Sequence, residues 1–403
     1  MADVLIVGAG PAGVAAAVPL AAAGREVVVV DKALFPRDKC CGDGLTTLAL
    51  RELEVLGFEP STVADWQVVG DAVLRSPSGR EVVVPLPPGP GTYAAVAPRA
   101  QLDAALVDVA VKAGATVVQG HGADGTITAR ADHVVVGLDD HEPVAARYVV
   151  AADGMWSPIR KALGLGEPGY LGEWHAFRQY VGGVDGPATE HLYVWFDADL
   201  LPGYAWSFPL PDGRANVGFG VLRDGTRRIR DMKASWAELL DRPHVRAALG
   251  PAAALEGRHT AWPIPARIDR ATLADGRVLM VGDAAMATDV MTGEGIGQAL
   301  LTGRVAAEAI LAAGALDADA ARRGYATAVH HHLVADHRMS SALGRVLAHE
   351  RGARGAIGIL ARSGDWGRRH FARWMFEDEP RALALTPSRW HRRILARPGA
   401  FGG

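Results

Sequence analysis

The chain has 403 residues, a length that exceeds one hydrophobic core and predicts two closely joined lobes. About half of the residues are hydrophobic and the formal net charge is −3, which is typical of a globular protein and gives no indication of a nucleic-acid partner. The only cysteines, Cys40 and Cys41, are adjacent, which argues against a disulfide framework and favours a cytoplasmic location. No stretch approaches about twenty uncharged apolar residues, so we expect no membrane-spanning helix.

The N-terminus predicts a βαβ unit with a glycine-rich turn. A strand over Asp3–Val7 leads into Gly8-Ala-Gly-Pro-Ala-Gly13, then a helix over Val14–Ala23 and a strand over Glu26–Val30. In such a turn the first glycine permits the bend, the second lets a pyrophosphate approach, and the third lets the helix pack on the strand. The acid after the second strand is placed to bind ribose hydroxyls. The predicted dinucleotide site comprises Gly8, Gly10, Ala12, Gly13, Asp31 and Lys32.

The next segments alternate between loops, helices and short strands. A loop over residues 33–44 precedes a helix over Leu45–Leu56, and short strands with a Pro/Gly-rich segment fill residues 66–98. A helix over Arg99–Ala113 and a strand over Thr116–Val118 follow, and Thr126–Val149 has the pattern of an antiparallel meander.

Aromatic-rich strands between about Gly172 and Pro265 predict an antiparallel sheet. The strand Val278–Val281 returns to the parallel sheet, the helix Glu294–Leu311 follows, and everything beyond is expected to be helical. The predicted fold is therefore α/β, with a Rossmann-type FAD-binding domain, an inserted antiparallel β-sheet substrate domain and a helical C-terminal region. The FAD-binding domain comprises residues 1–65, 99–171 and 266–320. The substrate domain comprises residues 66–98 and 172–265, and the helical C-terminal region comprises residues 321–403.

Two further strand ends favour FAD over NAD as the dinucleotide. Asp153-Gly154 and Gly282-Asp283 each follow a strand of the predicted parallel sheet, where ligands gather at the carboxyl edge. The segment Met291–Ile296 then begins a long helix, whose free N–H groups can stabilise negative charge on a reduced flavin. One such segment alone would more commonly be a helix cap, but three in this order make a flavin site the better interpretation.

The segment around residues 204–220 predicts an apolar binding surface. Tyr204, Trp206 and Phe208 alternate, which places their rings on one face of a strand. Pro209 ends the ladder, and Gly218 and Gly220 leave room on a neighbouring strand. Rings at this spacing are usually plain core, but their spacing to the two glycines favours a site for a long apolar ligand.

These motifs together resemble a known family. The three flavin segments look like those of the para-hydroxybenzoate hydroxylase fold, and Phe35–Leu45 is similar to the flavin loop of the geranylgeranyl reductase family. That family's substrate-pocket signature resembles the segment Tyr204-x-Trp-x-Phe-Pro209, which is followed after eight residues by Gly218-x-Gly220. Taken together, these motifs are similar to those of actinobacterial menaquinone reductases in particular. The resemblance covers roughly residues 3–320 and implies reduction of isoprenoid double bonds.

The resemblance also implies roles for single residues. It adds to the FAD site Lys39, Cys41, Gly42, Gly44, Arg99, Ala123, Asp153, Gly154, Asp283, Gly293, Gly295 and Ile296. Its substrate residues are Tyr204, Trp206, Phe208, Pro209, Gly218 and Gly220, and on chemistry alone Cys41 and Tyr204 are the candidate catalytic proton donors. Three positions depart from the family pattern. Asp31 stands where a glutamate is commoner, Val290 stands where a proline is usual, and Cys40 occupies a position that is usually not a cysteine.

Other features concern partners. There is one glycine-rich nucleotide loop, so NAD(P)H or another reductant would bind only transiently. Consecutive His330, His331 and His332 point to different helix faces, so no metal site is expected. From Arg351 onward eleven arginines face four acids, with aromatic residues interleaved. This pattern suits either peripheral membrane contact or a solvated helical cap whose arginines pair with the main lobe.

Four functions remain open from the sequence. The favoured one is an FAD-dependent reductase of a prenyl chain in an isoprenoid lipid or quinone, an apolar substrate. The main alternative is a monooxygenase that hydroxylates an aromatic or polyketide-like molecule through a flavin C4a-hydroperoxide. A flavin halogenase needs a lysine after the flavin loop, and no lysine occurs between Lys39 and Lys112. A non-catalytic FAD-binding protein is the fourth, and the oligomeric state stays undetermined.

Overall fold

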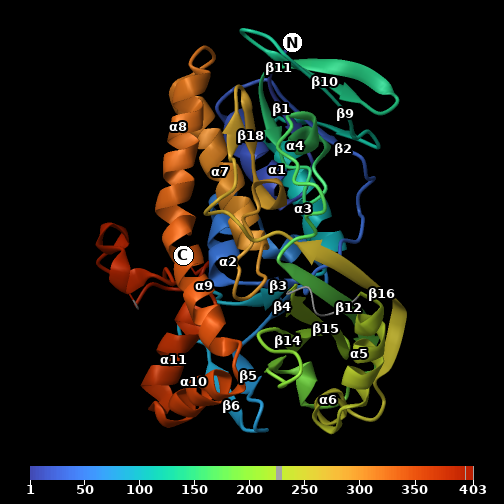
Figure 1. Ribbon diagram of the computed structural model, residues 1–403, viewed down its shortest axis with the longest axis vertical. Helices are drawn as coiled ribbons and strands as arrows, with labels where there is room; N and C mark the ends of the chain where they lie inside the picture. Colours follow the sequence, from blue (N-terminus) through green and yellow to red (C-terminus); the bar gives the residue numbers. More distant parts are fainter. Residues whose placement is uncertain (224–228, 395, 403) are drawn as a thin grey trace.

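The computed structural model describes residues 1–223, 229–394 and 396–402. Two large sheets lie one beyond the other along the molecule, and C-terminal helices run beside both (Figure 1). This arrangement confirms the predicted α/β class with an antiparallel sheet and a C-terminal helical region.

The first sheet has eight strands and a parallel centre. Strands β18, β11, β1, β2 and β8 are parallel neighbours in that order, β17 pairs antiparallel with β18, and β10 and β9 extend antiparallel from β11. The bounds are β1 (Ala2–Val7), β2 (Val27–Asp31), β8 (Thr116–Gln119), β9 (Ala123–Ala129), β10 (Val134–Leu138), β11 (His141–Ala151), β17 (Ala274–Asp275) and β18 (Val278–Met280). The central strands are buried on both faces, as their runs of valine and isoleucine predict.

Helices cover this sheet. The small residues of α1 let α7 pack closely against it, and Gly303 of α7 lies so near that a Cβ there would be 2.1 Å from the carbonyl oxygen of Ala12. The bounds are α1 (Pro11–Ala22), α2 (Thr47–Val55), α3 (Arg99–Lys112), α4 (Pro158–Ala162) and α7 (Ile296–Ala313). In the described part of the chain α7 is the single helix long and apolar enough to cross a membrane, and two-thirds of it is buried inside the protein.

The second sheet has seven strands in the order β16-β12-β15-β14-β13-β5-β6. Every neighbouring pair is antiparallel except β13 and β5, which are parallel. The bounds are β5 (Asp71–Arg75), β6 (Glu81–Pro85), β12 (Trp174–Gly182), β13 (Leu192–Trp195), β14 (Tyr204–Leu210), β15 (Arg214–Leu222) and β16 (Ala254–Ile264). Helices α5 (Ile229–Asp241) and α6 (Pro243–Leu249) follow β15, and a small sheet of β3 (Gly44–Leu45), β7 (Ala95–Val96) and β4 (Gln67–Val68) lies between the lobes.

The C-terminal region links the two lobes. Helix α8 packs on α7, and α10 and α11 contact β6 of the second sheet (Figure 1). The bounds are α8 (Ala318–Val329), a π-helical turn (His330–Val334), α9 (Ala335–Leu347), α10 (Glu350–Arg362) and α11 (Gly364–Met375). The expectation that everything beyond Leu311 is helical is wrong after Met375, where the described residues form two short 3₁₀ turns and one β-bridge between Ala400 and Thr92, because Pro380, Pro387 and Pro398 interrupt regular helix.

Candidate active site

The glycine-rich turn has the backbone geometry of a phosphate cradle. Gly8 adopts a φ of +108°, and a Cβ at Gly13 would lie 1.8 Å from the Gly8 carbonyl oxygen, so both positions require glycine. At Gly10, in contrast, a Cβ would meet only the Arg37 guanidinium, at 3.8 Å. Pro11 occupies the first turn of α1, so the N–H groups that follow are free to face an anion.

Asp31 stabilises this turn as well as facing the cavity. Its carboxylate accepts hydrogen bonds from the backbone N–H of Ala9 at 2.7 Å and of Ala33 at 2.8 Å. Asp31 also lines the same cavity as Gly8 and Gly10. Its Oδ2 therefore holds the turn through Ala9, while the side chain borders the space for the nucleotide.

The two other strand-end aspartates lie beside the cradle. Asp153 accepts from the N–H of Ile159 at 3.1 Å, its Oδ1 is buried with no hydrogen-bond partner among the described residues, and burial raises its pKa to about 6. Asp283 lies 3.8 Å from the Lys39 ammonium and 3.4 Å from the Thr288 hydroxyl. An unpartnered buried carboxyl oxygen and a lysine beside an open cradle are what a polyhydroxylated, phosphorylated ligand such as FAD would satisfy.

An arginine cluster lies behind the phosphate cradle, and of its members the sequence predicted Arg99 but not Arg37 or Asp103. Asp103 on α3 is fully buried and binds both Arg99 and Arg37, at 2.7 Å and 2.6 Å. The two guanidinium groups hold the pKa of that carboxyl below its usual range despite burial, and the Asp103 carboxylate in turn raises the pKa of Arg99 although burial acts against it, so Arg99 stays protonated. Arg37 and Arg99 both line the cavity, so each can offer a fixed positive charge to phosphate.

The flavin loop is held by a second buried acid, Asp43, which sequence reasoning also missed. Its carboxylate accepts from the Tyr180 hydroxyl at 2.6 Å, the Asn216 amide at 2.8 Å and the Arg99 backbone N–H at 3.3 Å. Asp43 has a φ of +65°, and burial raises its pKa to about 6. The sequence feature that could have identified Asp43 is its position directly after Cys41-Gly42 in the flavin loop. An acid buried in a loop needs several hydrogen-bond donors around it.

The aromatic strand face forms as predicted. Successive ring centroids of Tyr204, Trp206 and Phe208 are 6.0 Å and 5.9 Å apart, and all three rings line the cavity. The Phe208 ring lies against the flavin loop, since a Cβ at Gly44 would be 2.9 Å from it. Gly42 and Gly44 therefore let the loop approach the sheet.

The structure gives Gly218 a role other than substrate contact. Gly218 is paired with Trp206 on β14, and a Cβ there would lie 2.4 Å from the indole ring. The space is thus taken by Trp206 and not left for a ligand. Gly13, Pro209 and Gly218 do not line the cavity, whereas every other residue predicted for the cofactor or substrate site does.

One cavity of about 1150 Å³ joins the nucleotide cradle to the C-terminal helices. Beyond the aromatic face its walls come from β5, β13, α9, α10 and α11, and they are almost wholly apolar: Leu74, Val194, Leu347, Ile357, Leu360 and Phe371. Val346 of α9 and Ala356 of α10 line this end and are also exposed, which makes the space between these two helices the candidate opening to solvent. Sequence reasoning had no signal for this wall, because its residues come from five separate elements.

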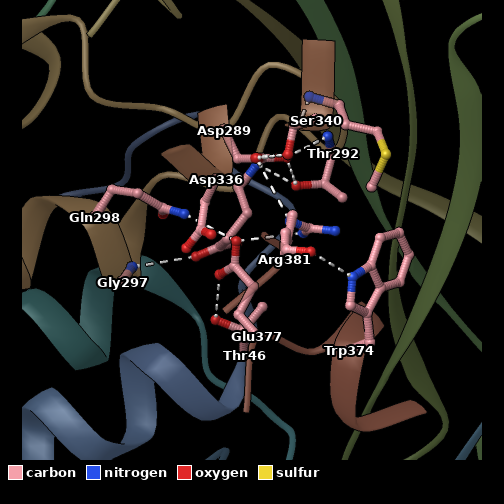
Figure 2. A network of polar contacts seen from close by, with 12 residues as sticks. Thr46, Asp289, Thr292, Gly297, Gln298, Asp336, Ser340, Trp374, Glu377 and Arg381 are labelled. Carbon is pink, nitrogen blue, oxygen red and sulfur yellow. Dashed lines mark hydrogen bonds and ion pairs between the residues drawn. The ribbon is translucent and has the colours of Figure 1, made fainter. Parts of the chain in front are cut away.

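A polar network ties the C-terminal segment to the loop before α7 (Figure 2). Asp289 accepts from Ser340 at 2.7 Å and from the Thr292 hydroxyl at 2.8 Å, and its carboxylate lies 3.5 Å from the Arg381 guanidinium. Arg381 also binds Glu377 at 3.3 Å. Residues almost a hundred positions apart in the chain therefore shape the predicted flavin loop.

The two candidate proton donors from the sequence are both poor acids here. Burial raises the pKa of the Cys41 thiol to about 11. Burial, with Glu294 and Asp289 nearby, also raises the pKa of the Tyr204 phenol, whose hydroxyl donates to the Thr292 carbonyl. Neither group releases a proton readily at neutral pH.

Comparison with known proteins agrees with this geometry. Residues 1–313 match the model of an FAD-binding domain family. The chain is 36% identical to a menaquinone reductase of Mycolicibacterium smegmatis over 340 residues, 78% of each chain. It is 35% identical to digeranylgeranylglycerophospholipid reductase 2 of Methanopyrus kandleri over 326 residues, covering 79% of this chain and 78% of that one. The protein belongs to the geranylgeranyl reductase family of FAD-dependent oxidoreductases.

A solved structure shows the same fold. A geranylgeranyl bacteriochlorophyll reductase-like protein of Thermoplasma acidophilum superposes with a TM-score of 0.79 at 22% identity, over 94% of this chain and 97% of that one. The family membership confirms FAD as the cofactor that the cradle, the arginine cluster and the strand-end aspartates accommodate.

Proposed function

We propose that this protein reduces carbon–carbon double bonds of a prenyl chain carried by an isoprenoid lipid or quinone. The observation that carries the proposal is the continuous apolar cavity, which leads from the FAD cradle past Trp206 to Ile357 and Leu360. Relatives named as menaquinone and digeranylgeranylglycerophospholipid reductases support the same substrate class. A monooxygenase for a compact aromatic ring would need a closed chamber with a polar anchor, and this wall offers apolar side chains instead.

Bound and reduced FAD would supply a hydride to one alkene carbon. The chain's own residues position the reactants: Gly8 and Gly10 admit the pyrophosphate, Arg37 and Arg99 neutralise it, and Trp206 borders the prenyl chain. Each buried CH₂ of that chain contributes about 0.8 kcal/mol to binding, so a long chain needs no polar anchor. NAD(P)H or another reductant would bind transiently to reload the flavin.

The opening between α9 and α10 would admit the substrate from a membrane surface. Ile359 and Trp366 are 71% and 72% exposed on α10 and α11, and the arginines Arg351, Arg362 and Arg369 are exposed on the same two helices. Each well-placed arginine contributes about 1 kcal/mol to binding an anionic surface. We therefore propose a cytoplasmic enzyme that contacts the membrane peripherally here.

Part of the basic tail serves another purpose. Arg373 and Arg381 are buried and ion-paired, and Arg389 binds Asp336 at 2.9 Å. Arg381 pairs with Asp289 of the main lobe, as the helical-cap interpretation expects, whereas the ion pairs of Arg373 and Arg389 lie within the C-terminal region. Sedimentation with vesicles of anionic lipid, but not of neutral lipid, would support the membrane contact, and Trp366→Ala should weaken it.

The test of the function is anaerobic. The bound flavin is reduced, the excess reductant is removed, and a prenyl quinone or prenyl lipid is added without oxygen. Flavin reoxidation together with a product that has gained two hydrogens supports the proposal. Reoxidation that requires oxygen, with a hydroxylated product, would instead establish the monooxygenase.

A further inference from the structure

Two half-buried carboxyl groups accept hydrogen bonds from the first turn of α7. The Glu294 carboxylate accepts from the N–H of Ile296 at 3.0 Å and of Gly297 at 3.3 Å. Glu377, from the C-terminal segment, accepts from the side-chain amide of Gln298 at 2.9 Å (Figure 2). Adjacent residues of one helical turn thus hold both acids, which lie 83 positions apart in the chain.

Glu294 faces the reaction space. Its side chain lines the cavity with Gly293 and Gly295, and Tyr204 of the aromatic face binds the carbonyl of nearby Thr292. Both hydrogen bonds to the Glu294 carboxylate reach Oε1, and within the described part of the chain Oε2 has no hydrogen-bond partner. One carboxyl oxygen is therefore available to a substrate.

The surrounding charges favour a proton on this pair. Arg381 lies between Glu377 and Asp289, and Asp289 stays ionised because Arg381 and two hydroxyl groups hold its pKa below the usual value. The groups that face Glu294 are Glu377, Arg99, Cys41 and Tyr204. Burial and then the Glu377 charge raise the pKa of Glu294 to about 8, and burial raises that of Glu377 to about 7.

An unsatisfied acceptor lies on the same helical turn. Gln298 is only 4% exposed, and its Oε1 is buried without a hydrogen-bond partner among the described residues. Its Nε2 already donates to Glu377. A carboxyl group that carries its proton is the kind of donor that this oxygen lacks.

We propose that Glu294 and Glu377 share one proton and that Glu294 donates it to the prenyl substrate. As hydride from the reduced flavin forms a C–H bond at one alkene carbon, the Glu294 O–H bond breaks and a C–H bond forms at the other carbon. Glu294 is left as the carboxylate, and water then returns one proton to the pair. The inference rests on the proposed function for its substrate.

The test compares Glu294→Gln and Glu377→Gln with the wild type in anaerobic single turnovers, using a prenyl quinone as the probe. Wild-type reoxidation should slow as pH rises through about 8, because the donor loses its proton. Glu294→Gln should lose on the order of 10²-fold in rate, the usual worth of a general acid, while binding FAD normally. Glu377→Gln should move the pH midpoint downward, because its charge no longer repels that of Glu294.

A matched control and a second readout separate this proposal from a structural role. Asp336→Asn alters a carboxyl of the same network that lies outside the cavity lining, and it should leave the pH profile unchanged. At neutral pH the infrared spectrum should contain a protonated-carboxyl band that Glu294→Gln or Glu377→Gln removes, whatever substrate is used. An unchanged infrared spectrum in both variants, or a wild-type rate and profile in Glu294→Gln, would overturn the proton donor. A wild type that no prenyl compound reoxidises would overturn the proposed function and leave the infrared test to decide the shared proton.

Discussion

The FAD cradle and the far end of the cavity are built in different ways. The cradle comes from one continuous segment, where Gly8, Gly13 and Asp31 follow each other within a single βαβ unit. The far end comes from β5, β13 and helices α9–α11, and Arg381 and Glu377 connect it to the flavin loop. Local chain geometry therefore determines the phosphate cradle, whereas long-range packing determines where the substrate would lie.

The largest effect is expected when the ion pairs that fix the C-terminal segment are removed. Arg381→Met removes the fully buried cation between Asp289 and Glu377 and leaves their charges unpaired. We expect a loss of about 3–5 kcal/mol in the free energy of unfolding. Chemical denaturation measures it, and the exposed Arg393→Ala should change stability little. A wild-type stability for Arg381→Met would show that the segment is only an appendage.

A smaller effect is expected in the cradle. Gly13→Ala would place a methyl group 1.8 Å from the Gly8 carbonyl oxygen, so the turn must shift. We expect about 1–3 kcal/mol of destabilisation, together with loss of bound FAD. The control is Gly355→Ala, on an exposed face of α10 where nothing lies within 4 Å. Unchanged flavin content in Gly13→Ala would contradict the geometry of the cradle.

The opening can be tested without disturbing either lobe. Ala356→Trp fills an exposed position that lines the cavity, whereas its neighbour Gly355→Trp lies outside the lining. We expect the KM for a long prenyl substrate to rise on the order of tenfold in the first variant, equivalent to about 1.4 kcal/mol, and little in the second. Equal kinetics in the two variants would place substrate entry elsewhere.

The smallest expected effect is a pH dependence in the C-terminal region. Burial lowers the pKa of His332 to about 4 from an ordinary 6.5. Between pH 4 and pH 6.5 the histidine is therefore protonated more in the unfolded chain than in the folded one. Its contribution lowers the free energy of unfolding as the pH falls from about 6.5 toward 4. Because the ring is partly exposed, we expect roughly 1 kcal/mol or less. Denaturation at pH 7 and pH 5 should show less loss in His332→Gln than in the wild type or in the control His330→Gln, an exposed neighbour that does not contribute to the shift.

The same contrast explains what could be predicted from the sequence. The cradle and the ring row of Tyr204, Trp206 and Phe208 follow from local spacing, because strand and helix periodicities place those side chains without further information. The partners of Asp43 could not be predicted, since Tyr180 and Asn216 reach it from the other sheet.

Two other differences have the same origin. Gly218 makes room for Trp206 and not for a ligand, which only the register of β14 and β15 reveals. The apolar face of α10 forms part of the cavity wall, and the sequence could not predict this because an apolar helix face says nothing about which surface covers it.

The central claim is that a prenyl chain occupies the apolar cavity between the FAD cradle and the C-terminal helices. A crystal structure of the FAD-bound protein with a prenyl quinone tests it most directly. We predict continuous density for the chain from beside Trp206 to the wall formed by Ile357 and Leu360, with its far end at the opening between α9 and α10. A quinone bound outside this cavity, or a C-terminal half of the cavity that stays empty while the ligand is seated elsewhere, would contradict the account.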